Sequence, residues 1–193
     1  MLKEIVFDIE TQNTFAEVDN DIRRLKISVV SIYRYETGLF ESFTETELSR
    51  LWPILEKSDR LIGFNSEHFD LPVLMNYYPG DLTKLPHLDM LKVVKDSLGF
   101  RIKLDDLAQA TLDDTKKSAD GLQAVRWWRE GKIDEVKKYC EQDVNITKML
   151  YEFGKDNNQL FYKNLTGETI PFAVNFSFKE PSVQSKINLT LPF

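Results

Sequence analysis

Two carboxylates stand on one face of an otherwise apolar segment near the start of the chain. Residues 3–9 read KEIVFDI, a pattern that predicts a buried β-strand. Side chains two apart on a strand point to the same face, so Asp8 and Glu10 are expected to project together. Burying an unpaired charge costs much free energy, and hard divalent cations such as Mg²⁺ or Mn²⁺ offset that cost. The segment therefore predicts a strand that carries metal ligands.

Two further motifs complete an acidic site. Asp70 follows a short apolar strand predicted at 61–64, and ligands of α/β sheets usually bind at the carboxyl ends of strands. Tyr139 and Asp143 are four residues apart on a predicted helix, so they share one face. Two like charges about 6 Å apart repel by roughly 3 kcal/mol at an effective dielectric near 20. The pattern therefore predicts a site for two divalent ions, whose charge balances four carboxylates: Asp8, Glu10, Asp70 and Asp143.

The order of the other predicted elements indicates an α/β fold, with helices on the faces of a sheet. Strands are predicted at 3–9, 27–35, 39–43 and 61–64, and helices at 44–58, 69–77, 88–98, 104–110, 119–129 and 133–153. A terminal hairpin is predicted from 160–165 and 169–178, and a polar tail from Pro181. We expect residues 1–157 to form the main domain, with 158–193 as a hairpin and tail packed on it.

Net charge, cysteine content and the lengths of apolar runs limit the classes of protein to which this chain can belong. The net charge of −6 argues against broad, nonspecific coating of DNA, although residues 116–138 carry a local net charge of +3. The single cysteine excludes an internal disulfide and fits a reducing compartment. The start of the chain lacks the apolar core of a secretory signal, and no run of 18 apolar residues exists. We therefore expect a cytoplasmic protein that does not span a membrane.

Taken together, the three motifs resemble those of the DEDD 3′–5′ exonuclease superfamily. The first motif is Phe7 to Thr11, the second pairs Asn65 with Phe69-Asp70, and the third is Tyr139 to Asp143. The histidine form of the third motif would need His at position 138, where this chain has Lys138, so the tyrosine subclass is indicated. The sequence is most similar to a group of bacterial and archaeal predicted exonucleases related to the proofreading domain of family B DNA polymerases, over about residues 3–155.

The resemblance implies a ribonuclease H-like fold with a mixed central sheet, and a two-metal 3′–5′ exonuclease. Asp8, Glu10, Asp70 and Asp143 would hold two Mg²⁺ or Mn²⁺ ions, and the products would be nucleoside 5′-monophosphates. Tyr139 would hydrogen-bond the attacking water. Because a free phenol has a pKa near 10, we expect it to orient that water more than to deprotonate it. The expected substrate is the 3′ end of single-stranded DNA. An RNA 3′-end trimmer and a catalytically idle nucleic-acid-binding module are the alternatives.

Five residues are candidates for contact with the substrate. The resemblance implies that Thr11 would lend its backbone to the 3′ end of the substrate. Asn65 would hold the terminal nucleotide or cap a turn, and His68 would touch a phosphate or remain an exposed loop residue. Lys116 and Lys117 lie in a polar loop suited to backbone phosphates. Three further residues have two readings each: Trp127 and Trp128 as a stacking surface or as core, and Asp89 as an accessory metal ligand or a charge at a helix N-terminus.

Overall fold

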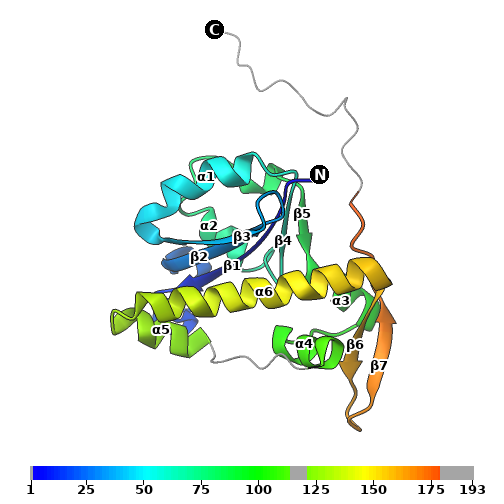
Figure 1. Ribbon diagram of the computed structural model, residues 1–193. Coiled ribbons are helices and arrows are strands. Elements are labelled where there is room, and N and C mark those ends of the chain that lie inside the picture. The colour runs from blue at the N-terminus through cyan, green and yellow to red at the C-terminus, as the bar shows by residue number, and fades with distance from the viewer. Residues whose placement is uncertain (1, 114–120, 179–193) are drawn as a thin grey trace.

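The computed structural model describes residues 2–113 and 121–178, which build a five-stranded sheet, a covering layer of helices and a terminal hairpin (Figure 1). The sheet has the order β3-β2-β1-β4-β5. Its strands are β1 (Glu4–Thr11), β2 (Ile27–Arg34), β3 (Leu39–Thr44), β4 (Arg60–Gly63) and β5 (His87–Asp89). Strands β1, β2 and β3 pair antiparallel, whereas β4 is parallel to both β1 and β5. The mixed central sheet is thereby confirmed.

Helices lie on both faces of this sheet. The longest, α6 (Ile133–Asn157), crosses one face, and α1 (Leu48–Glu56) and α2 (Asp70–Leu74) lie on the other (Figure 1). The remaining helices are α3 (Met90–Leu98), α4 (Leu104–Leu112) and α5 (Gly121–Arg129), with 3₁₀ helices at Phe15–Val18, Ile22–Arg24, Glu45–Glu47 and Leu82–Lys84. None of the helices in the described ranges is long and apolar enough to cross a membrane.

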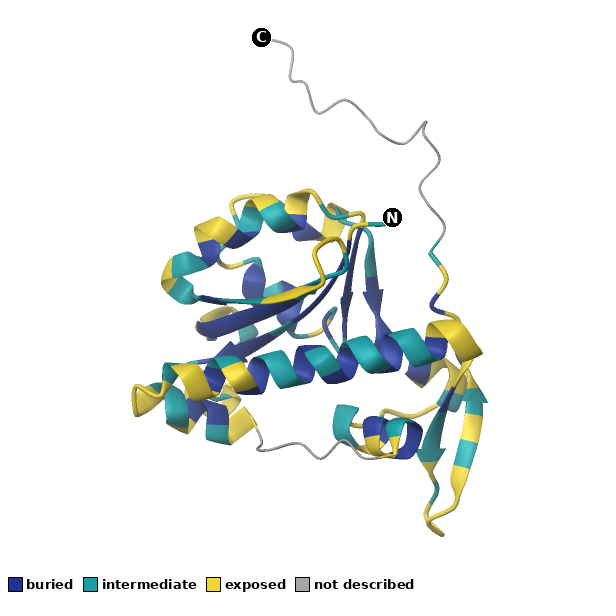
Figure 2. Cartoon of the chain, in the orientation of Figure 1, coloured by how far each residue is buried: buried dark blue, intermediate teal, exposed yellow. Residues whose placement is uncertain are grey.

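Strand β1 separates two apolar cores because its side chains alternate between the faces of the sheet. Ile5, Phe7 and Ile9 pack with residues of α1 and α2, whereas Val6 packs with residues of α3, α4 and α6. Figure 2 shows the central strands buried, and α6 buried where it faces them. Asp8 and Glu10 lie two and four positions after Val6, so their side chains point to the same face of the sheet as that of Val6, which is the face that α6 covers.

The end of β1 remote from Glu10 is held by a buried polar cluster. The Glu4 side chain accepts a hydrogen bond from Tyr151 Oη at 2.8 Å and pairs with Arg60 at 3.5 Å. Glu4 and Arg60 are 4% and 3% exposed, so the pair compensates two buried charges, and the half-exposed Lys155 lies 3.5 Å from the other oxygen of Glu4. Arg60 also donates to the carbonyl of Phe176 at 3.0 Å, which fixes the chain beyond the hairpin to the sheet.

The predicted terminal hairpin is confirmed, as β6 (Gln159–Lys163) paired antiparallel with β7 (Thr169–Ala173). It packs against α4, where the Thr111 hydroxyl donates to the Phe161 carbonyl at 3.1 Å and accepts from the Phe161 N–H at 3.0 Å. The Ser97 hydroxyl at the end of α3 donates to the carbonyl of Ala173 at 2.7 Å. The predicted tail from Pro181 lies outside the described residues.

Two predictions of secondary structure were wrong in detail. Residues 87–89, of which 88–89 were expected in a helix, form strand β5, and α3 begins at Met90. A three-residue strand is too short to show a period of two. The helix expected over 69–77 covers only Asp70–Leu74, because tight backbone turns replace a regular helix after Met75.

Candidate metal centre

Three carboxylates converge at the carboxyl end of β1. Asp8 and Glu10 of β1 and Asp143 of α6 each offer an oxygen within 4.8 Å of the others. Glu10 is 8% exposed and Asp143 is 4% exposed. Strand alternation turns Asp8 and Glu10 toward α6, and a helix places Asp143 one turn after Tyr139. A cluster made only of carboxylate oxygens is the donor set that Mg²⁺ and Mn²⁺ prefer, so these residues fit the predicted metal.

Asp70 lies beside this cluster and is not among its three members. It opens α2 after the loop that follows β4, and its Oδ1 accepts the backbone N–H of Ile9 at 3.2 Å. That bond ties the α2 loop to β1 between Asp8 and Glu10. Burial raises the pKa of Asp70 to about 8, and the charges of Asp89 and Asp143 add to the rise. Near neutral pH the metal-free carboxyl of Asp70 is therefore largely protonated.

The loop before Asp70 is held in place by Asp89. This carboxylate accepts the backbone N–H groups of Asn65 at 2.8 Å, Glu67 at 3.0 Å and Leu91 at 3.0 Å. It is also the N-cap of α3. These contacts support the role of Asp89 as a charge at a helix N-terminus over the role of an accessory metal ligand, because its carboxylate oxygens already accept hydrogen bonds from backbone N–H groups.

A cleft of about 680 Å³ opens beside the acidic cluster. Asp8, Glu10, Asp143 and Tyr139 line it, together with residues of β1, of the 3₁₀ helix Phe15–Val18 and of α5. Tyr139 is 2% exposed and packs edge-to-face against Trp127, with ring centroids 6.2 Å apart. An aromatic neighbour in this geometry restricts the phenol ring, so its hydroxyl keeps a fixed direction.

The rim of the cleft is apolar and is bridged by an ion pair. Phe15 of the 3₁₀ helix and Leu122 of α5 both line the cleft and are 43% and 55% exposed. Arg129 of α5 donates to Glu17 of the 3₁₀ helix at 2.6 and 2.7 Å, which links the two elements. A backbone hydrogen bond from Thr14, followed by the bond from Arg129, lowers the pKa of Glu17 to about 2. The cleft thus places the acidic cluster beside apolar walls.

Cys140 supports the cluster from the core side. The thiol is fully buried and lies 3.4 Å from the carbonyl oxygen of Asp8 and 3.6 Å from its Oδ2. Burial raises the pKa of Cys140 well above that of a free thiol, with the charges of Asp8 and Glu10 adding to the effect. The thiol therefore remains a proton donor to Asp8. The contact of Cys140 with Asp8 joins residues of two different elements and was not predicted from the sequence.

The residues predicted to contact the substrate do not all lie in the same cleft. Thr11 lines the cleft, with its hydroxyl donating to the carbonyl of Asn13 at 2.8 Å. Asn65 lies in a neighbouring groove and adopts a left-handed backbone with φ of 65°. His68 is exposed and does not line the cleft. Lys116 and Lys117 lie outside the described residues.

Two further findings concern residues near the site. Trp127 and Trp128 pack against Val29, Val136 and Cys140, which supports the core reading of the tryptophan pair. Arg101 was missed from the sequence: its Nη2 donates to Oδ1 of Asn65 at 2.6 Å. The two partners are 36 positions apart in the sequence, so no local pattern predicts this contact.

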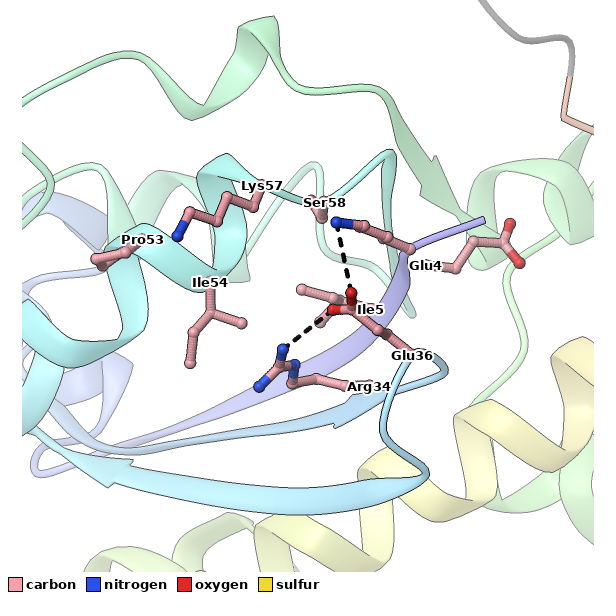
Figure 3. Close-up of a pocket in the computed structure, with 9 residues that line it drawn as sticks. Glu4, Ile5, Arg34, Glu36, Pro53, Ile54, Lys57 and Ser58 are labelled. Atoms are coloured by element: carbon pink, nitrogen blue, oxygen red, sulfur yellow. Dashed lines mark hydrogen bonds and ion pairs between the residues drawn. The ribbon is translucent and has the colours of Figure 1, made fainter. Parts of the chain in front are cut away.

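A second cavity, of about 360 Å³, lies at the opposite end of the sheet, between α1 and the start of β1 (Figure 3). Lys3, Arg34, Glu36 and Lys57 are among its lining residues. Glu36 pairs with both Lys3 at 3.4 Å and Arg34 at 3.2 Å. Because these charges compensate one another, the acidic cleft is the better candidate for chemistry.

Comparison with known proteins agrees with this architecture. The family model RNase_H_2, described as RNase_H superfamily, matches residues 5–153. No curated protein matches the chain. Among solved structures, the family B DNA polymerase from the hyperthermophilic archaeon Pyrobaculum calidifontis is similar, with a TM-score of 0.62 and 17% identity. The match covers 80% of this chain but 24% of the polymerase, so it concerns the fold of one part of that enzyme. Since the family model spans most of the chain, including all three acidic motifs, the protein belongs to the RNase H superfamily.

Proposed function

We propose that the protein is a metal-dependent 3′–5′ exonuclease that removes nucleoside 5′-monophosphates from single-stranded DNA. The observation that carries the proposal is the convergence of Asp8, Glu10 and Asp143 within 4.8 Å, in a cleft that Tyr139 also lines. Carboxylates from separate elements rarely gather at low exposure without a cation. The superfamily and the likeness to part of a DNA polymerase support a phosphodiester substrate.

In this proposal the side chains of the protein bind the metal ions and orient the attacking water. Asp8, Glu10 and Asp143, joined by Asp70 when it loses its proton, would hold two divalent ions, Mg²⁺ or Mn²⁺. When bound, such ions supply positive charge to the phosphate and lower the pKa of a bound water. The ring of Tyr139 packs against Trp127, and its hydroxyl would form a hydrogen bond with the attacking water.

The cleft also fits one end of a nucleic acid strand. Its volume of about 680 Å³ is within the range of pockets that take a nucleotide-sized ligand. Phe15, Phe69 and Leu122 would contact the terminal base through their apolar surfaces. The guanidinium of Arg101, positioned by Asn65, would meet a backbone phosphate one step further along the strand.

The test is a time course on a 5′-labelled single-stranded DNA 20-mer with Mg²⁺ or Mn²⁺, and with EDTA as a chemical control. Asp143→Asn preserves the shape of the site and should abolish cleavage. Asp134→Asn changes an exposed carboxylate on the same helix and should leave the rate unchanged. A ladder that shortens from the 3′ end only with metal is expected.

Two outcomes would refute the proposal in different ways. Equal cleavage by wild type and Asp143→Asn would show that the acidic cluster is not needed for the reaction. Cleavage of a labelled RNA 20-mer with no cleavage of the DNA would replace the DNA exonuclease with an RNA 3′-end trimmer.

A further inference from the structure

An aromatic row runs from Phe100, which follows the end of α3, to the terminal hairpin, and the hairpin lies beyond the segment 5–153 that the family model matches. Phe100 is 46% exposed and packs edge-to-face against Tyr162 of β6, with centroids 5.7 Å apart. Tyr162 in turn packs edge-to-face against Phe172 of β7 at 6.0 Å. A large aromatic ring left half in solvent on a folded surface is available to stack on a ligand.

This row, Phe100, Tyr162 and Phe172, is held rigidly. The hydroxyls of Ser97 and Thr111 bind the two strands of the hairpin to α3 and α4. Gly99 ends α3 with φ of 80°, a conformation that favours glycine, and so turns Phe100 out of the helix. A preformed surface loses little conformational entropy when a ligand stacks on it.

The segment that follows Phe100 lines a groove that reaches the loop before Asp70. The lining carries two cations, Arg101 and Lys103, and one carboxylate, Asp105, among apolar side chains. Residues 101–105 line a groove of about 400 Å³ together with Asn65. Arg101 and Lys103 in this segment are exposed, and Arg101 donates to Asn65 at 2.6 Å. The next residue back along the chain from Arg101 is Phe100. Exposed cations next to a stacking ring are the combination that single-stranded nucleic acids require.

We propose that Phe100 and Tyr162, with Arg101 and Lys103, form a second binding site for single-stranded nucleic acid. It would hold nucleotides upstream of the 3′ end that sits in the cleft, and in this respect the inference rests on the proposed function. Base stacking on Phe100 binds without regard to sequence, and the two cations bind the backbone. The consequence is a preference for longer strands that the acidic cleft alone would not give.

The test is a binding series with fluorescently labelled oligothymidylates of two to twenty nucleotides, followed by anisotropy. It uses the Asp143→Asn background with Mg²⁺, so that substrate is not consumed. Phe100→Ala should weaken binding of the 20-mer about tenfold and leave the dinucleotide unchanged, because one stacked base contributes about this much. Phe100→Trp should restore binding. Phe40→Ala is the matched control, since Phe40 is a 38% exposed ring packed on Tyr33 at the far edge of the sheet, and it should bind as the background does.

The outcomes separate this inference from the proposed function. Equal binding of the 20-mer by Phe100→Ala and its background would overturn the second site, even if the wild type cleaves DNA. A loss of the same size at every length would also overturn it, because Phe100 would then act on the cleft. If the wild type cleaves nothing but binding shows the length-dependent loss, the second site stands and the exonuclease does not.

Discussion

Asp70 provides a sharp test of the metal centre, because the metal must compete with a proton there. With a pKa near 8, the Asp70 carboxyl is protonated at pH 6, and a cation that takes it as a ligand must displace that proton. Each pH unit below the pKa costs about 1.4 kcal/mol, so binding at pH 6 should be about 100-fold weaker than above pH 8. The apparent affinity for Mg²⁺ should therefore rise about tenfold per pH unit and level off above pH 8.

Isothermal titration calorimetry in buffers of different ionisation enthalpy counts the protons released. A pKa raised above neutral predicts that most of a proton is released per binding event at pH 7 and little of one at pH 9. Asp70→Asn carries no proton to lose, so its binding should be weaker above pH 8 and nearly independent of pH. Identical proton release by wild type and Asp70→Asn would refute the assignment of Asp70 as a ligand.

Three other substitutions test the surroundings of the site. Tyr139→Phe keeps the ring against Trp127 but removes the hydroxyl, so kcat on single-stranded DNA should fall about 100-fold with Mg²⁺ affinity unchanged. Gly63→Ala would put a methyl 2.6 Å from Cβ of Ser66, and chemical denaturation should show about 1–3 kcal/mol of lost stability together with reduced cleavage. Arg60→Met leaves the buried Glu4 with only the half-exposed Lys155 as a cation partner, and we expect a loss of about 3 kcal/mol in the free energy of unfolding; a loss below about 0.5 kcal/mol would contradict this account.

The features that sequence predicted best were those set by local periodicity. The period of two along β1 placed Asp8 and Glu10 on one face, and the period of the helix placed Tyr139 and Asp143 on another. Since neither pattern depends on distant residues, the structure has the same strand and the same helix at these positions. The hairpin was similarly marked by alternating residues around a Gly-containing turn.

The features that sequence could not supply depend on contacts between distant segments. The raised pKa of Asp70 comes from burial and from Asp89, which belongs to a strand too short to recognise. The hydrogen bond between Arg101 and Asn65, and that between Cys140 and Asp8, join residues 36 and 132 positions apart. Only the packed structure brings such partners together.

The buried cluster of Glu4 and Tyr151 has a mechanical consequence for the distant metal centre. Among the contacts of helix α6 with β1, the hydrogen bond of Tyr151 lies near one end of the helix, and Asp143 lies eight residues earlier, about 12 Å away along the helix axis. If the helix pivots about Tyr151, each degree of tilt moves Asp143 by roughly 0.2 Å relative to β1. Metal ligands tolerate displacements of only a few tenths of an ångström. A substitution near Tyr151, outside the cleft, would therefore be expected to change the spacing of Asp143 from Asp8 and Glu10.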